Sequence, residues 1–234
     1  MRALREQAAR LAQLQRLDPD LPDNKFAAQQ RVEIDSRGDE VSPGVRSGKG
    51  EAGRRDKPGD LLLLDVAASY ANYNSDLTRT LPVSGKFTRR QKQVYAAVLR
   101  VLRQSIQGLV AGRLLKDWQR EAEQLIQVEL LGLDLLTPRQ IKAQDPGRPA
   151  LKKYFMHGVG HPLGLDVHDV SPVAQPLQAG WVMTVEPAIY IPEEGLGIRL
   201  ENDVLVTETG PVDLMAHIPI EIADIEKLMA GKKV

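Results

Sequence analysis

The sequence predicts an α+β protein with a largely antiparallel sheet. Two observations support this fold class: apolar, strand-like segments follow one another in pairs, and amphipathic helices separate the pairs. The chain has 234 residues, with 42% hydrophobic and 26% charged residues, which is typical of a soluble globular protein. We divide it into an N-terminal segment, residues 1–56, and a folded domain, residues 57–234.

The N-terminal segment is expected to contribute little regular structure. Residues 3–16 predict a helix, because Leu4, Ala8 and Leu11 recur at spacings of three and four. The tract from Asp18 to Asp60 is rich in glycine, proline and charge, so we predict mostly flexible loop, with a short strand at 31–35. Residues 44–50 lack the spacing of a phosphate-binding loop and are interpreted as a basic loop.

The folded domain begins with two consecutive strands, expected at 61–70 and 71–83. Thr88 and Gln91 form a capping-box signature, which predicts that a helix starts there. The later elements expected from the pattern are, in chain order, a helix at 115–131, a polar connector at 137–150, strands at 154–157, 181–191 and 197–207, and a short helix at 222–229.

Composition argues against several classes of partner. The chain carries 31 Lys and Arg against 31 Asp and Glu, so no general attraction to nucleic acid or to an anionic membrane is expected. The apolar run at 61–68 is interrupted by Asp65 and is too short to cross a bilayer. The absence of cysteine and of an N-terminal apolar signal core suits a cytoplasmic protein.

Two aspartates interrupt the first pair of strands. Asp76 lies eleven residues after Asp65, so a reversal near Tyr70 and Ala71 would place the two residues opposite each other. Their Cβ atoms would then be roughly 5 Å apart, and the carboxylates would repel unless a cation or a shared proton lay between them. The alternative is structural: Asp76 caps a turn and Asp65 lies at a strand end.

Two glutamates repeat this arrangement later in the chain. The loop at 192–195 is a plausible reversal, and it would bring Glu186 and Glu201 face to face across a hairpin. A solvent-facing glutamate on an amphipathic strand is the alternative, but apolar residues dominate both segments, and Glu186 is flanked by Val185 and Pro187.

Three histidines, His157, His161 and His168, fall within a glycine-rich stretch that is unsuited to a helix, so the helical HExxH zinc motif is excluded. Such a cluster is a candidate for metal binding or acid–base chemistry, and spacing alone does not choose among the three. Arg79 and Arg199 lie near the acidic residues and are either partners of the site or ordinary surface cations.

Four carboxylates and one imidazole suit two divalent cations. Oxygen-rich ligation favours Mn²⁺, with Co²⁺, Fe²⁺ or Zn²⁺ as alternatives. Two such ions can share a water molecule, lower its pKa and polarise a substrate carbonyl. The residues therefore predict a two-metal hydrolase site.

Several segments resemble the catalytic domain of the Xaa-Pro aminopeptidases (aminopeptidase P), in the group that includes prolidase and methionine aminopeptidase. The matching segments are GDLLLLDVAASYANYNSDLTRT, PVSGKFTRRQKQVY, MHGVGHPLGLDVHD, VMTVEPAIYIPEEG and GIRLENDVLVT. The resemblance implies the pita-bread (creatinase/aminopeptidase) fold, a mainly antiparallel curved sheet with helices outside. It also implies a catalytic role for residues 57–234 and a dinuclear site, usually of manganese.

The resemblance also implies roles for individual residues. Glu186, a ligand, would also shuttle a proton from the bridging water to the leaving nitrogen. His157 and His168 would contact substrate, with His168 placed to stabilise the developing oxyanion, and Arg199 would support the ligands. The implied metal ligands are Asp65, Asp76, His161, Glu186 and Glu201.

The implied reaction is hydrolysis, by a metal-bridging hydroxide, of the bond between an N-terminal residue and a following proline. The implied partner is thus a peptide with proline in second position, and a homo-oligomer is compatible with the family. Two alternatives stay open: an Xaa-Pro dipeptidase (prolidase), or a truncated metal-binding relative with little activity that acts as a binding or regulatory protein.

The N-terminal part of the fold is expected to be incomplete. No histidine precedes His157, so a substrate-contacting histidine of the family is missing. The strand at 61–68 is also expected to lack a partner on one side, which would leave an exposed edge.

Overall fold

The structure, a computed structural model, describes residues 33–35, 59–170 and 174–230. The helix predicted at 3–16, the basic loop at 44–50 and most of the predicted flexible tract lie outside the described residues.

A long antiparallel hairpin forms the first half of the fold. Strand β2 (Leu61–Tyr70) pairs with β3 (Tyr73–Pro82) through a tight two-residue turn. Ala71 and Asn72 of this turn have φ angles of 50° and 69°, the left-handed conformation that a type I′ hairpin turn requires. Strand β1 (Glu33–Asp35) pairs with β2 on its other side. The short strand predicted at 31–35 is therefore confirmed at 33–35, and the prediction that the first strand lacks a partner was wrong.

The second half of the fold contains shorter antiparallel strands. Strand β5 (Val182–Val185) lies between β4 (Pro162–Leu163) and β8 (Asn202–Leu205), and β9 (Val212–Asp213) follows β8. Strands β6 (Ala188–Ile191) and β7 (Leu196–Arg199) form a separate hairpin. The two long strands expected at 181–191 and 197–207 are thus each interrupted, at 186–187 and at 200–201.

The hairpin between β6 and β7 turns where the sequence predicted. A 3₁₀ turn, η2 (Pro192–Glu194), is closed by Gly195, whose φ of 58° is left-handed.

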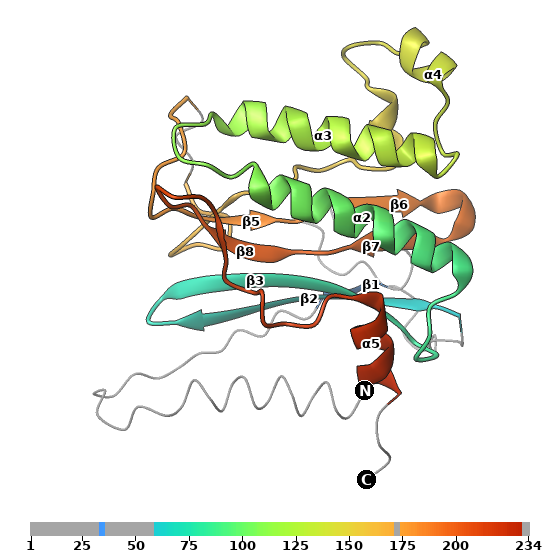
Figure 1. The fold of residues 1–234 in the computed structure, drawn as a ribbon, viewed down its shortest axis with the longest axis horizontal. Helices are drawn as coiled ribbons and strands as arrows, with labels where there is room; N and C mark the ends of the chain where they lie inside the picture. The colour runs from blue at the N-terminus through green and yellow to red at the C-terminus, as the bar shows by residue number, and fades with distance from the viewer. Residues whose placement is uncertain (1–32, 36–58, 171–173, 231–234) are drawn as a thin grey trace.

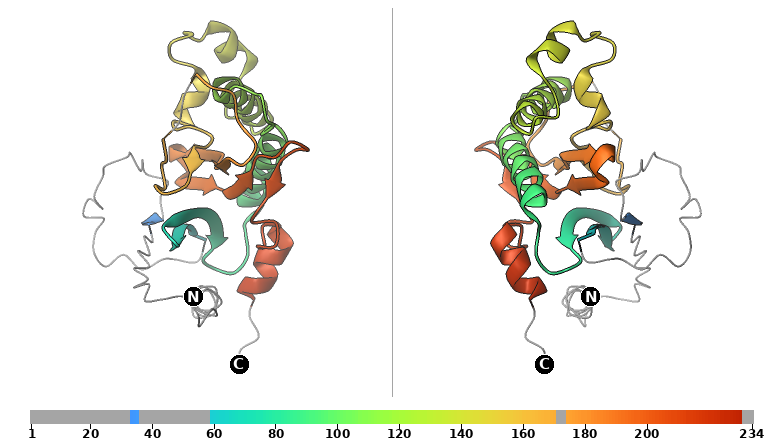
Figure 2. Two further views of the ribbon diagram at one scale, coloured as in Figure 1. Left: turned by 90° about the vertical axis from the view of Figure 1, so that its left-hand side faces the viewer. Right: turned by 90° about the vertical axis from the view of Figure 1, so that its right-hand side faces the viewer.

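Two long helices cover one face of these strands (Figure 1). Helix α2 (Arg89–Gln107) begins at the predicted capping box on Thr88, and α3 (Leu115–Gly132) follows it, close to the predicted range. The Trp118 indole N–H of α3 donates a 2.8 Å hydrogen bond to the Ser105 carbonyl of α2. Figure 2 shows α2 and α3 on one side of the strands and α5 (Ile222–Met229) beside the β2–β3 hairpin.

The region between α3 and β4 differs from the sequence prediction. The polar connector contains a short helix, α4 (Pro138–Ala143), which starts at a second capping box, on Thr137. A 3₁₀ turn, η1 (Ala150–Lys153), precedes 154–157, where the predicted strand is absent. Consecutive residues Tyr154 and Phe155 are both buried, so this segment lacks the alternation that a strand with one exposed face requires.

The core lies between the helices and the strands. Val94, Tyr95 and Val98 of α2 are fully buried, as are Met183 of β5 and Ile198 of β7. This packing holds α2 against the back of the strands that flank Glu186 and Glu201. Within the part of the chain that the structure describes, no helix is long and apolar enough to cross a membrane.

Candidate metal centre

The β2–β3 hairpin brings the two aspartates to one face. Asp65 pairs with Thr78, and Asp76 pairs with Ala67, so the predicted direct pairing of Asp65 with Asp76 was wrong by two residues. The reversal lies at Ala71 and Asn72 and not one residue earlier, which shifts the whole register. Residues diagonal to each other in a ladder still share a face, so the two carboxyl groups remain neighbours.

The two glutamates face each other across the second half of the fold. Val185 pairs with Asn202 in one ladder, and Ala188 pairs with Arg199 in the other, so the two ladders have the same register. Glu186 and Glu201 lie between these pairs, in opposed positions, as the sequence predicted.

Strand β3 joins the aspartate pair to the glutamate pair. The Glu201 backbone N–H donates to the Thr78 carbonyl at 3.1 Å. The Thr78 hydroxyl in turn donates to Glu201 Oε2 at 2.6 Å. One residue thus binds both the backbone and the carboxylate of Glu201.

The histidine segment is bound along β5. The Thr184 backbone N–H donates to the His161 carbonyl at 2.9 Å, and the His161 N–H donates to the Thr184 hydroxyl at 3.0 Å. Gly160 is required for this approach, because a Cβ atom there would lie 2.0 Å from the Thr184 carbonyl oxygen. The glycine-rich sequence therefore lets His161 reach the carboxylates.

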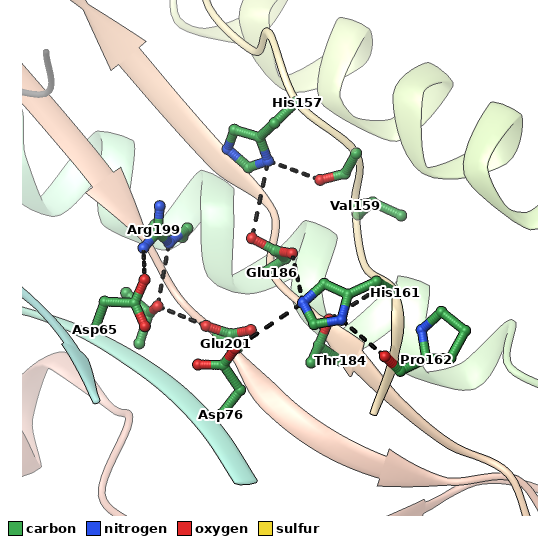
Figure 3. A network of polar contacts seen from close by, with 12 residues as sticks. Asp65, Asp76, His157, Val159, His161, Pro162, Thr184, Glu186, Arg199 and Glu201 are labelled. Atoms are coloured by element: carbon green, nitrogen blue, oxygen red, sulfur yellow. Dashed lines mark hydrogen bonds and ion pairs between the residues drawn. The ribbon is translucent and has the colours of Figure 1, made fainter. Parts of the chain in front are cut away.

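The His161 ring presents one nitrogen to the acidic cluster (Figure 3). Its Nδ1 lies 2.9 Å from the Pro162 carbonyl oxygen, which can only accept, so Nδ1 is the protonated nitrogen of the neutral ring. Nε2 lies 3.6 Å from Glu186 Oε1 and 3.9 Å from Asp76 Oδ2. Burial lowers the pKa of His161, which keeps Nε2 free to bind a metal ion.

Ligand-type atoms of three residues converge at this point of the fold. One atom each from Asp76, His161 and Glu201 lies within 4.8 Å of the other two. Glu186 joins them through its contact with His161, whereas Asp65 is turned toward Arg199.

Arg199 organises the side of the cluster opposite His161 (Figure 3). Its guanidinium forms an ion pair with the Asp65 carboxylate and donates to the Thr78 hydroxyl at 3.1 Å. It also donates to the Tyr190 hydroxyl at 3.3 Å, and that hydroxyl lies 3.1 Å from His157 Nε2. Arg199 is therefore a partner of the site and not a surface cation.

The other two histidines border the cluster. His157 Nδ1 lies 3.9 Å from Glu186 Oε2, and burial lowers the pKa of His157 to about 4, so its ring is neutral. His168 is exposed, and its ring centroid lies 4.0 Å from that of His161. The structure thus brings together the five predicted ligands and Arg199, with His157 and His168 at the border.

Burial and mutual repulsion make this cluster unfavourable without a cation. Burial raises the pKa of Asp76 to about 9, and the adjacent Glu201 and Asp65 carboxylates add to the shift. Burial likewise raises the pKa of Glu186 to about 8, against the lowering effect of Arg199, and it raises the pKa of Glu201. Divalent cations would neutralise these charges, so the donor set of four carboxylates and one neutral imidazole fits a metal centre.

The sequence did not identify three supporting residues. Thr78 lies two residues after Asp76 and therefore on the same face, a signal that the pattern contained. The buried Asp203 carboxylate accepts from the Asp76 N–H at 3.1 Å and lies two residues after Glu201. Tyr190 reaches the site through its contacts with Arg199 and His157, which no local pattern indicates.

Comparison with known proteins agrees with this architecture. Residues 34–208 match the model of metallopeptidase family M24, so the chain belongs to that family. It is 41% identical over 186 residues to the Xaa-Pro aminopeptidase of Haemophilus influenzae, which covers 73% of this chain and 42% of the relative. The chain thus spans under half the length of this curated relative.

Solved structures of aminopeptidase P share the fold. Escherichia coli aminopeptidase P with the inhibitor Pro-Leu is 38% identical, covering 74% of this chain and 42% of that chain at a TM-score of 0.67. The zinc-substituted E. coli enzyme in complex with product matches with the same identity, coverage and TM-score. The predicted pita-bread fold and the resemblance to aminopeptidase P are therefore confirmed.

Proposed function

We propose that this chain is a metal-dependent aminopeptidase that hydrolyses the bond between an N-terminal residue and a following proline. The observation that carries the proposal is the convergence of Asp76, His161 and Glu201 within 4.8 Å, beside Glu186 and Asp65, on the pita-bread fold. The relatives named as Xaa-Pro aminopeptidases support the choice of substrate.

The metal would be held by Asp65, Asp76, His161, Glu186 and Glu201. Four carboxylates balance the charge of two divalent cations, with Mn²⁺ as our first choice and Co²⁺, Fe²⁺ or Zn²⁺ as alternatives. When bound, the two ions would lower the pKa of a water molecule and polarise the scissile carbonyl.

Glu186 is the residue we assign to proton transfer. Its burial and its position between His161 and His157 leave its carboxyl facing the cluster, and burial raises its pKa to about 8. A carboxylate in that position can accept a proton and pass it on as a general acid–base group. Glu186 would accept the proton of the attacking water and deliver it to the proline nitrogen, which needs a proton to leave as an amine.

The two histidines at the border are assigned to the substrate. His157 is held by Tyr190 on one side and lies near Glu186 on the other, so it can orient a peptide end. His168 is exposed beside His161, and we assign it to the carbonyl oxygen on which negative charge develops. Arg199 holds Asp65 in place through an ion pair.

The test combines metal content with substrate length. Metal-depleted protein, incubated with Mn²⁺ and passed over a desalting column, should retain about two ions per chain. Xaa-Pro-Xaa tripeptides and Xaa-Pro dipeptides are then assayed side by side. Cleavage of the tripeptides supports the proposal, and cleavage of dipeptides alone would favour the dipeptidase alternative.

Matched histidine variants separate metal binding from folding. His161→Ala should lose bound metal and all hydrolysis, because it removes the imidazole that faces Asp76 and Glu186. His217→Ala is the control, since His217 is exposed and lies outside the cluster. If the wild type and His217→Ala both bind metal but the wild type cleaves no peptide, the result would favour a binding or regulatory relative.

A further inference from the structure

The face of β3 that carries Asp76 continues toward the hairpin tip. Asn74 lies two residues before Asp76 and therefore on the same face. Its backbone N–H donates to the Gly164 carbonyl at 2.8 Å. Its side-chain amide donates to the same carbonyl at 3.1 Å and to the Leu165 carbonyl at 2.7 Å. One residue of the strand thus makes three hydrogen bonds to a segment 90 residues away.

That segment, residues 164–170, is a loop held together by hydrogen bonds between its own residues. The Asp169 carboxylate accepts from the Leu165 N–H at 3.0 Å and from the Val170 N–H at 2.7 Å. The loop leaves no room for a larger residue at Gly164, because a Cβ atom there would lie 2.1 Å from Asp169 Oδ2. These bonds make the loop one unit, so a contact at Gly164 and Leu165 also constrains the residues that follow.

The loop carries His168 to the site. The His168 side chain is exposed, but its ring lies 4.0 Å from the His161 ring, centroid to centroid. An exposed side chain has little packing of its own, so the position of the ring depends on the backbone that carries it. The Asn74 side chain links that backbone by hydrogen bonds to β3, the strand that carries Asp76.

We propose that Asn74 is a positioning residue that fixes the loop 164–170 on β3 and thereby holds His168 against the metal centre. The inference rests on the proposed function, in which His168 faces the substrate carbonyl. Asn74 acts through His168 and does not itself contact the reacting atoms. Its loss is expected to lower kcat while leaving metal content unchanged.

Asn74→Ala and Ser75→Ala form a matched pair. The Ser75 hydroxyl bonds only across the hairpin in the described structure, to the Ala68 backbone at 3.2 and 3.3 Å. Asn74→Ala should speed amide hydrogen exchange in residues 164–170 and shift the NMR signals of the His168 ring, whereas Ser75→Ala should do neither. Unchanged exchange and unchanged ring signals in Asn74→Ala would overturn the proposal.

Kinetics with an Xaa-Pro-Xaa tripeptide test whether Asn74 acts through His168. Asn74→Ala should lower kcat by about 10- to 100-fold, the usual consequence of a small misplacement of a catalytic group. In a His168→Ala background, Asn74→Ala should cause no further loss. A further loss of the same size would indicate a merely structural role and overturn the proposal.

The two proposals fail in different ways. If the wild-type protein cleaves no Xaa-Pro peptide, the proposed function is wrong, and the exchange and NMR measurements still decide whether Asn74 positions the loop. If the wild type is active but Asn74→Ala retains full kcat, the proposed function stands and the role of Asn74 is wrong.

Discussion

Thr78 contacts two residues of the candidate centre with one hydroxyl group. The hydroxyl donates to Glu201 Oε2 and accepts from the Arg199 Nε–H. Arg199 also forms the ion pair with Asp65, so Thr78 lies between the aspartate and glutamate sides of the cluster. Groups that hydrogen-bond metal ligands fix the orientation of those ligands before the metal arrives.

Thr78→Val should therefore weaken metal binding without unfolding the protein. Valine keeps the shape of threonine but cannot orient the Glu201 carboxylate, so Mn²⁺ affinity measured by calorimetry should fall by about 10- to 100-fold. Thr207→Val is the control, because its hydroxyl bonds the Gly210 carbonyl in a turn at 2.6 Å, away from the cluster. Equal Mn²⁺ affinity in the two variants would contradict the role of Thr78.

At the scale of elements, turn geometry decided the register of the site. The left-handed pair Ala71 and Asn72 places Asp65 opposite Thr78, which puts a hydroxyl where the sequence suggested a second carboxylate. The later hairpin closes at Gly195, as predicted, and keeps Glu186 opposite Glu201. A turn shifted by one residue thus changes which side chains meet across a ladder.

The two capping boxes give a matched test of what helix α2 contributes. In each box the threonine hydroxyl accepts a 3.3 Å hydrogen bond from the backbone N–H of the glutamine three residues later. The side chain of that glutamine accepts a 2.8 Å hydrogen bond from the backbone N–H of the threonine. Helix α2 has ten buried residues, whereas α4 has none. The two capping boxes therefore have the same hydrogen-bond lengths but begin helices that differ in how many core residues they carry.

Thr88→Ala should lower the free energy of unfolding by about 1 kcal/mol, because it leaves helix N–H groups unpaired on an element of the core. Thr137→Ala should change it little, since α4 can fray without exposing the core. Urea denaturation of both variants measures the difference. Equal losses in the two variants would show that the cap of α2 is not coupled to global unfolding.

At the scale of the whole molecule, the acidic cluster opposes folding above acidic pH when no metal is bound. The pKa values of Asp76 and Glu186 are raised to about 9 and about 8 in the folded state, and that of Asp203 to about 7. The unfolded chain loses these protons near pH 4, so from there upward it binds fewer protons than the folded chain. The stability of the metal-free protein should therefore fall as pH rises from about 4 to about 9.

Divalent metal should reverse this fall, because it binds the ionised carboxylates of the folded protein only. The increase in Tm caused by Mn²⁺ should be larger at about pH 8 than at about pH 5.5. Thermal denaturation with Mn²⁺ or with a chelator measures it, and Asp76→Asn should flatten the metal-free profile. Metal-free stability that rises over this range would contradict the raised pKa values.

The sequence by itself determined the residue types of the centre and much of the local structure. The Asp65 and Asp76 pair, the Glu186 and Glu201 pair and the glycine-rich histidine segment were each visible over short stretches of chain. The helix at Thr88 and the reversal at Gly195 were also predictable, because caps and turns depend on nearby residues.

Only the tertiary structure decided how these pieces meet. The hydrogen bond between Thr78 and Glu201 spans 123 residues, and that between Asn74 and Leu165 spans 91. Such contacts depend on the packing of α2 behind the strands and on the register of each hairpin. A local pattern reports the period and the turns of one segment, but it contains no information on which distant segment will lie beside it.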